Sequence, residues 1–245
     1  MSEGPQPLRL RYLQAMGIPV WVRRARAAPA ADPRPARGGG AAGEGGAADG
    51  TDTAGLDWDA LQARVAGCER CGLARTRTQT VFGVGDRNAR WMFIGEAPGA
   101  DEDRQGEPFV GRAGRLLNAM LAALGLERRA VYIANILKCR PPNNRDPAPE
   151  EVACCEDYLR RQVALVAPAV IVALGRVAAH NLLKTDTSLA RLRGRVHRYG
   201  PRGTPLIVTY HPAYLLRSPG EKRKAWEDLC HARRVALQDD DPAAG

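Results

Sequence analysis

Five of the six cysteines fall in three separate segments of the chain: Cys68, Cys71, Cys139, Cys154 and Cys155. Thiolates gathered from separate segments are typical of tetrahedral zinc sites and of iron–sulfur clusters. The spacing lacks the second C-x-x-C pair of a zinc ribbon, which favours a cluster. Neighbouring positions on a helix point about 100° apart, so we expect only one of Cys154 and Cys155 to face the site. The alternative is a set of buried free thiols, the state that we predict for Cys230.

Three polar side chains come at or just after the ends of predicted strands. Glu96 follows the strand 91–94, Asn135 lies late in the strand 131–137, and His211 follows the strand 206–210. In an open parallel sheet the carboxyl ends of the strands form one edge, and ligands bind there. Three polar side chains on that edge are more than the fold requires, so we predict that they form a binding or catalytic site.

The elements that must position these residues alternate between strands and helices. Apolar runs predict strands at 91–94, 131–137, 169–174 and 206–210. Amphipathic stretches predict helices at 56–65, 112–124, 149–166 and 221–235, and Gly175 is expected to open a further helix. The alternation predicts an α/β fold: a three-layer αβα sandwich with a central, mostly parallel four-stranded sheet.

Composition divides the chain into four parts. Residues 25–54 are mostly Ala, Gly, Pro, Arg and Asp, and we predict a disordered linker. The compact domain is expected at 55–237, followed by an acidic tail at 238–245. Residues 1–24 carry an apolar pattern that includes Trp21. They are interpreted either as a peptide that docks on a partner or as an arm that folds back on its own domain.

The formal net charge is +9, from 36 Lys and Arg against 27 Asp and Glu. This balance favours a polyanionic partner such as nucleic acid. No window holds the ~18 consecutive apolar residues that a membrane span needs, and the N-terminus lacks the apolar region of a secretory signal. We therefore expect a cytoplasmic protein, in which cysteines serve metal or thiol chemistry rather than disulfides.

Four strings carry a resemblance to a known family: GEAPGADED at 95–103, GEPFVG at 106–111, NILKCRPPNNR at 135–145 and HPAYLLR at 211–217. In this order they closely resemble the family 4 uracil-DNA glycosylases, and the resemblance covers the whole compact domain. It implies an enzyme that flips uracil out of DNA and hydrolyses its N-glycosidic bond, which initiates base excision repair. It also implies a [4Fe–4S] cluster bound by Cys68, Cys71, Cys139 and Cys155.

The resemblance also implies roles for the site residues. Phe109 matches the residue that stacks on the flipped uracil, although a core phenylalanine would fit the sequence equally well. Asn135 matches the amide that donates to uracil O4 and accepts from N3–H. His211 matches the histidine that donates to uracil O2 and stabilises the departing anion. The predicted substrate-binding set also contains Gly95, Ala97 and Pro98.

Water must then attack the oxocarbenium-like sugar, and Glu96 is the motif carboxylate that matches the position for orienting it. Ala97 stands where another branch of the superfamily has an aspartate, so a positioned water with little base assistance is the alternative. In the last motif Leu215 and Leu216 are predicted to act as apolar wedges in DNA, and Arg217 to hold a phosphate. Further phosphate candidates are Arg75, Arg77, Lys138, Arg140 and Arg145.

The string LQAMGIPVWVRR at 13–24 is similar to the N-terminal peptide of the psi subunit of bacterial DNA polymerase III, which docks on the chi subunit. It predicts that residues 1–24 bind chi, and we expect the chain to be a monomer. Two alternatives to an enzyme are a uracil-DNA capture protein with slow turnover and a zinc-binding DNA adaptor. Residues 140–147 lack the histidine and the insertion of the branch that captures DNA covalently.

Overall fold

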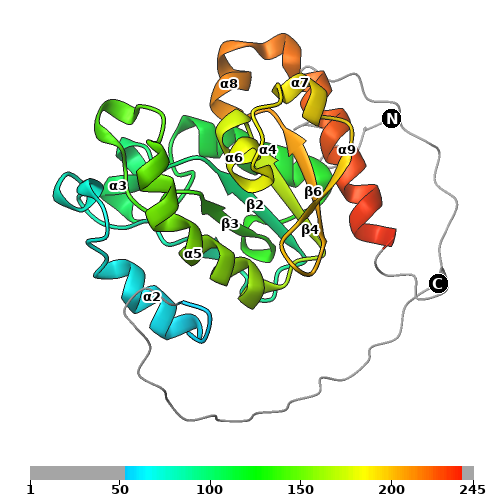
Figure 1. Cartoon of the computed structure of the whole chain (residues 1–245). Coiled ribbons are helices and arrows are strands. Elements are labelled where there is room, and N and C mark those ends of the chain that lie inside the picture. Colours follow the sequence, from blue (N-terminus) through cyan, green and yellow to red (C-terminus); the bar gives the residue numbers. More distant parts are fainter. Residues whose placement is uncertain (1–52, 239–245) are drawn as a thin grey trace, which may run out of the picture.

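A six-stranded sheet forms the middle of the molecule, with the strand order β1-β3-β2-β4-β6-β5 (Figure 1). The computed structural model describes residues 53–238. The strands are β1 (Val84–Gly85), β2 (Trp91–Gly95), β3 (Tyr132–Asn135), β4 (Val170–Leu174), β5 (Val196–Tyr199) and β6 (Thr204–Thr209). The four central strands are parallel, as predicted. The two edge strands, β1 and β5, are antiparallel to their neighbours and were not predicted.

Side chains alternate between the two faces of the central strands, which is the pattern of a sheet covered on both sides. Trp91 and Phe93 of β2 pack on one face with the apolar residues of the helices α4 (Arg112–Leu124) and α9 (Lys222–Gln238). Met92 and Ile94 pack on the other face with α5 (Pro149–Val166) and α6 (Arg176–Leu183). The predicted three-layer αβα sandwich is confirmed.

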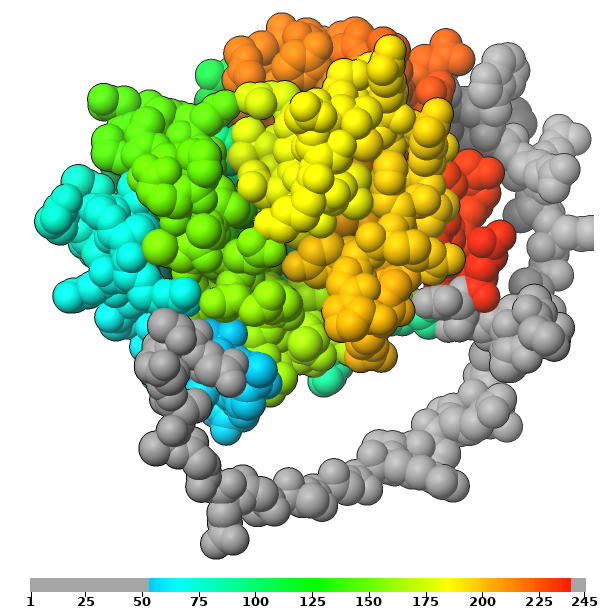
Figure 2. Space-filling view, viewed as in Figure 1, coloured from blue at the N-terminus to red at the C-terminus, as the bar shows by residue number. Residues whose placement is uncertain are grey.

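The remaining helices are short or lie outside these layers (Figure 1). Helix α2 (Trp58–Ala66) packs on the outer side of α5. Three short helices that sequence patterns did not predict are α3 (Ala100–Gln105), α7 (Leu189–Leu192) and α8 (Pro212–Arg217). Single 3₁₀ turns occur at η1 (Gly72–Arg75), η2 (Arg128–Ala130), η3 (Pro142–Asn144) and η4 (Pro219–Glu221). In the space-filling view α8 and η4 form the orange upper rim, next to the yellow surface of α6 and α7 (Figure 2).

The described part of the chain begins within the predicted linker. Thr53 is buried, and its hydroxyl donates to the carbonyl oxygen of Asp157 in α5 over 3.1 Å. The predicted docking peptide at 1–24, the linker up to residue 52 and the acidic tail beyond residue 238 lie outside the described residues. No helix between residues 53 and 238 is long and apolar enough to cross a membrane.

Candidate active site and metal centre

One pocket opens at the carboxyl edge of the sheet, above β2, β3 and β6. It gathers residues that lie far apart in the sequence, including most of the predicted site: Glu96, Ala97, Pro98, Phe109, Asn135, His211 and Arg217. The predicted convergence of the three motifs on one edge therefore occurs in the structure.

Gly95 lies at the end of β2, next to the pocket residue Glu96 in sequence and beside Asn135 in the register of β3. A Cβ atom on Gly95 would lie 2.5 Å from Asn135 Oδ1 and 2.7 Å from Phe109 Cζ. Only a residue without a side chain lets the amide and the aromatic ring approach this closely. Gly95 thus contributes to the site by leaving space for the two predicted base-binding side chains.

Phe109 has a left-handed backbone with φ of 55°, which is unusual for a residue other than glycine. Two neighbours stabilise it. The Glu102 carboxylate accepts hydrogen bonds from the backbone N–H groups of Val110 and Gly111, at 3.0 and 3.1 Å. Gly114 of α4 leaves room for the Phe109 carbonyl, because a Cβ there would lie 1.7 Å from that oxygen. Strain of this kind is typical of residues that are held for function.

The Asn135 backbone is held from behind by a buried lysine. Lys138 Nζ donates to the Asn135 carbonyl oxygen over 2.9 Å and to Gln162 Oε1 over 2.6 Å. Gln162 donates in turn to the Phe82 carbonyl oxygen over 2.9 Å. Lys138 is 1% exposed, so the prediction that it is a phosphate contact is wrong, and its role is to fix the end of β3.

The His211 ring is half-buried and lies 5.5 Å from the Phe109 ring, between centroids. Its Nδ1 accepts a hydrogen bond from the Ala213 backbone N–H at 3.1 Å. Nδ1 is therefore unprotonated, and the neutral imidazole carries its proton on Nε2. Burial, with a smaller effect of Arg217, lowers the pKa of His211 to about 4. The histidine is thus neutral at physiological pH and has one N–H to donate.

Glu96 lines the same pocket in a partly desolvated position. Burial and, to a smaller extent, the neighbouring Asp146 carboxylate raise its pKa to about 7, while Arg176 acts in the opposite direction. Asp146 and Arg176 form an ion pair with each other at 2.7 Å. A carboxyl group that titrates near neutral pH is suited to orient or activate water.

The predicted cluster ligands Cys68, Cys71, Cys139 and Cys155 interact electrostatically with one another. Burial raises the pKa values of Cys71 and Cys139, and Cys68 raises both further. Burial also raises the pKa of Cys155 to about 12, with contributions from Cys139 and Cys71. In the described part of the chain no three His, Cys, Asp or Glu side chains lie close enough to hold a single metal ion.

The two adjacent cysteines of α5 have different surroundings. Cys155 is buried, and the Lys138 backbone contributes a hydrogen bond to its thiol. The Cys154 thiol is half-buried and donates to the Arg70 carbonyl oxygen at 3.3 Å, although it also raises the pKa of Cys71. Arg77 donates from Nη1 to Cys139 Sγ over 3.2 Å. This arrangement agrees with the expectation that one of the two cysteines faces the site, and it favours Cys155.

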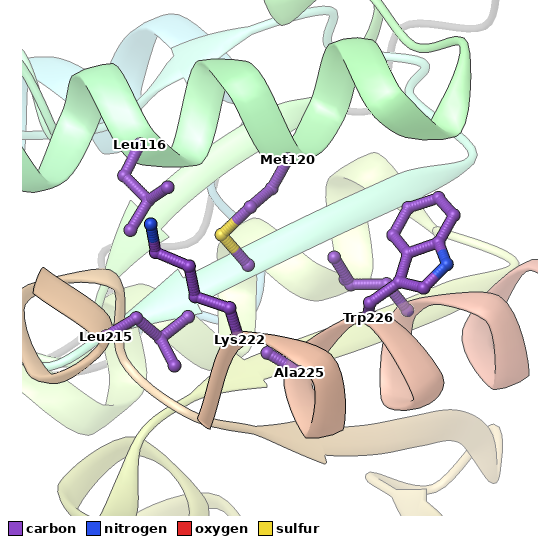
Figure 3. A pocket seen from close by; sticks show the side chains of 7 residues that line it. Leu116, Met120, Leu215, Lys222, Ala225 and Trp226 are labelled. Carbon is purple, nitrogen blue, oxygen red and sulfur yellow. The ribbon is translucent and has the colours of Figure 1, made fainter. Parts of the chain in front are cut away.

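Helix α8 is anchored by Leu215, whose side chain is 1% exposed. In Figure 3 Leu215 lies in a small apolar cavity opposite Leu116 and Met120 of α4 and next to Lys222 of α9. Leu215 is therefore a core residue in this structure, contrary to its predicted role as a wedge. Leu216, at 37% exposed, and Arg217 are the residues of the predicted DNA contact that face solvent.

Sequence reasoning missed several pocket residues that lie away from the strand ends, in short helices, a 3₁₀ turn and a loop: Glu102, Asn144, Asp146, Ala213 and Tyr214. Glu102 carried a sequence signal, because an acidic residue three positions after a helix N-cap is typical of a capping box. In the structure its Oε2 accepts from the Gly99 N–H at 3.1 Å. The others carry no signal beyond their place inside the motifs.

Comparison with known proteins identifies the family of this chain. The sequence profile of the Uracil DNA glycosylase superfamily matches residues 82–230. A type-4 uracil-DNA glycosylase of Archaeoglobus fulgidus is 47% identical over 74% of this chain and 97% of its own. A type-4 uracil-DNA glycosylase of Thermotoga maritima is 43% identical over 72% and 87%. A type-5 uracil-DNA glycosylase of Pyrobaculum aerophilum is 37% identical over 63% and 74%. The chain therefore belongs to the uracil-DNA glycosylase superfamily, in its type-4 family.

Proposed function

We propose that this uracil-DNA glycosylase takes uracil out of the DNA stack into the pocket and hydrolyses its N-glycosidic bond with Phe109, Asn135, His211 and Glu96. The reaction initiates base excision repair. The observation that carries the proposal is the neutral His211, whose tautomer is fixed by the Ala213 N–H, in one pocket with Asn135 and Phe109. A flipped base needs such an enclosed site, because its partner groups must replace stacking and pairing.

Recognition of uracil depends on Phe109 and Asn135. The Phe109 ring forms an apolar wall on which the base stacks. The Asn135 amide donates to uracil O4 and accepts from N3–H. Cytosine has the opposite polarity at both positions, so its binding would leave buried polar groups without partners, and the enzyme rejects it. Pro98 lines the pocket, and Gly95 leaves space for the close approach of Asn135 and Phe109.

Bond cleavage places negative charge on uracil and positive charge on the sugar. His211 Nε2–H donates to uracil O2, where the negative charge develops. A neutral imidazole is suitable here because it stabilises the anion by a hydrogen bond and keeps its own proton. The pKa of about 4 keeps the imidazole neutral throughout the physiological range.

Glu96 orients the water that attacks the sugar. Its carboxylate also faces the positive charge of the oxocarbenium-like sugar, which it stabilises electrostatically. Ala97 leaves the neighbouring position without a carboxylate, so Glu96 carries this part of the mechanism.

The test is strand scission of a labelled oligonucleotide with one uracil, followed by alkali. We expect His211→Ala and Asn135→Ala each to lower the single-turnover rate by about 100-fold or more. His197→Ala is the matched control, because His197 lies on the edge strand β5 and does not line the pocket. Its Nε2 is hydrogen-bonded to the Leu192 carbonyl oxygen of α7. A wild-type protein that forms a stable complex with the oligonucleotide and releases no uracil would support the capture function instead.

We propose that Cys68, Cys71, Cys139 and Cys155 hold a [4Fe–4S] cluster. The support is a set of neighbouring thiols, of which Cys139 and Cys155 are buried. As thiolates they repel one another, and bound iron would compensate this charge. When bound, the cluster supplies folding free energy that ties η1, the end of β3 and α5 together. The chain's own contribution includes the Arg77 donor to Cys139.

Metal analysis tests the ligand set. Cys155→Ser should lose iron, sulfide and the broad visible absorbance and should lower the melting temperature. Cys154→Ser, the adjacent control, should keep all of them. Zinc in place of iron in the wild-type protein would support the zinc-adaptor alternative.

Two proposals concern partners beyond uracil itself. Leu216 and Arg217 of α8 contact DNA, as apolar wedge and phosphate ligand respectively. Residues 1–24 dock on the chi subunit of DNA polymerase III, which would bring the enzyme to newly made DNA. The support for the second proposal is the sequence similarity at 13–24 alone. We propose that the enzyme acts as a monomer, which light scattering tests directly.

A further inference from the structure

An exposed aromatic side chain lies at the mouth of the pocket and has no part in the proposed chemistry. Tyr214 of α8 lines the pocket together with Ala213 and Arg217, and it remains 37% exposed. The core contact of this helix is made by the next residue, Leu215. Tyr214 therefore lies outside the apolar core to which Leu215 anchors α8.

The Tyr214 ring is held in one orientation by a stack behind it. It lies on the Tyr210 ring, with centroids 5.1 Å apart and planes at 26°. The Arg193 guanidinium lies over the Tyr210 ring at 4.4 Å and donates to the Tyr210 hydroxyl at 3.3 Å. The stack runs in the order Arg193, Tyr210, Tyr214, and Tyr214 is the member that lines the pocket.

The inner end of this stack is fixed strongly. Arg193 Nε donates to Asp228 Oδ2 over 2.6 Å, and Nη2 donates to the Lys224 carbonyl oxygen over 2.8 Å. Asp228 is only 3% exposed, so the ion pair is well shielded from solvent. These contacts connect the segment after α7 with α9, and Figure 2 shows the surface around α7 beside that of α8.

A preorganised aromatic ring at the rim of a base-flipping pocket suits one ligand in particular. Extrusion of a nucleotide unstacks the bases on either side of it, which costs free energy. An aromatic ring recovers part of that cost by stacking on an unstacked base, and it accepts any base because each has a π-face. Because Tyr210 covers one side of the Tyr214 ring, the open ring surface faces away from Tyr210.

We infer that Tyr214 stacks on a nucleobase next to the flipped uracil, and that Tyr210 and Arg193 are positioning residues that hold it for this contact. The inference rests on the proposed function, since it requires uracil to occupy the pocket. It adds a sequence-tolerant DNA contact that is distinct from the Phe109 contact with uracil.

The experiment compares the cluster-loaded wild-type enzyme with Tyr214→Ala and Tyr214→Trp. Substrates are oligonucleotides with 2-aminopurine on the 5′ or the 3′ side of uracil. Stacking on an aromatic side chain quenches 2-aminopurine fluorescence. Steady-state kinetics and inhibition by free uracil are measured for each enzyme. Val196→Ala, an exposed apolar residue on β5, is the control for loss of surface area.

For Tyr214→Ala we expect KM to rise by about fivefold to about 100-fold, kcat to change by less than about twofold, and inhibition by free uracil to stay the same. Quenching should be lost at one of the two positions in Tyr214→Ala and kept in Tyr214→Trp. Arg193→Lys should reduce the quenching without changing inhibition by uracil.

Two results would overturn the inference and leave the proposed function in place. The first is a Tyr214→Ala enzyme with an unchanged KM and unchanged quenching at both positions. The second is weaker inhibition by free uracil in that variant, which would place Tyr214 in the uracil pocket. Failure of the proposed function itself has a different signature, because free uracil would then not inhibit the wild-type enzyme.

Discussion

Glu96 is the residue whose ionisation most directly links the site to pH. Its pKa of about 7 results from burial and from the neighbouring Asp146 carboxylate. If the carboxylate orients water, the single-turnover rate should rise as pH passes through about 7 and level off about one unit higher. Glu96→Gln should lower the plateau rate by about 100-fold and abolish this rise. Rates measured between pH 5.5 and 9 check this, and a rise that persists in Glu96→Gln would assign the titration to another group.

The same shift has a consequence for stability. The folded-state pKa of Glu96 lies above its ordinary value of 4.5. Its contribution to stability is therefore fully present below about pH 4.5 and is lost as the pH rises through about 7. The free energy of unfolding of Glu96→Gln, taken relative to that of the wild type, should be higher at pH 8 than at pH 5. Urea unfolding at the two pH values measures this, and an equal difference at both would contradict the shift.

Gly175 controls the position of His211 from the neighbouring strand end. It has φ of +93°, and a Cβ there would lie 2.8 Å from His211 Cβ. Gly175→Ala should displace the imidazole and lower kcat by about 10- to 100-fold. Gly194→Ala is the matched control, with φ of +73° and no neighbour within 4 Å. It introduces a side chain at a positive φ without a steric clash and should keep the wild-type kcat. A comparable loss of kcat in both variants would point to general destabilisation.

At the scale of single residues, the motifs predicted which side chains lie together in the pocket, but not the contacts that hold them in position. Glu96, Asn135 and His211 share one pocket because strand ends converge on one edge, which a sequence pattern can indicate. Phe109 reaches the same pocket from the segment between α3 and α4. The supporting contacts depend on packing between distant segments. Lys138 was predicted on the surface because lysine usually lies there, yet it is buried beneath the Asn135 carbonyl.

At the scale of elements, α8 combines a buried anchor with the exposed surface that we propose contacts DNA, within six residues. Leu215→Ala would enlarge the cavity between α4, α8 and α9, and it should destabilise the fold by about 2–5 kcal/mol. Leu216→Ala should change stability by less than about 0.5 kcal/mol, because that side chain is exposed. Its effect should instead be a higher KM for DNA. Chemical denaturation and kinetics on both variants measure the two effects. A higher KM with unchanged stability in Leu215→Ala would instead support Leu215 as the wedge.

Elements with strong periodicity were predicted closely, and weak ones were missed for physical reasons. Helices α4 and α5 have the predicted bounds, because each pairs an apolar stripe with a clear start or stop residue. Strand β1 has two residues and β5 is half exposed, so neither carries an apolar run. Helices α3, α7 and α8 are too short for a helical period to be recognised, and tertiary contacts stabilise them.

At the scale of the whole molecule, the pocket depends on strand order. Strand β4 lies between β2 and β6, so His211 must reach the Glu96 side across the end of β4. Gly175 follows β4 there, and its N–H donates to the Thr209 carbonyl oxygen at 2.8 Å, which keeps the two strand ends together. Sequence alone gave the parallel strands but not this order, because pairing between strands distant in sequence is set by packing of the whole sheet.

The N-terminal segment should act independently of the glycosylase domain. If residues 1–24 dock on chi, deleting them should abolish binding to chi while leaving kcat on an oligonucleotide unchanged, because the pocket is built from residues 96–217. Trp21→Ala should weaken binding to chi by about 30-fold or more, since buried tryptophans dominate many interfaces. A full-length protein with residues 1–24 in scrambled order is the control for length and charge. Titration calorimetry with purified chi measures the affinity, and equal affinities for the intact and scrambled chains would rule out a sequence-specific dock.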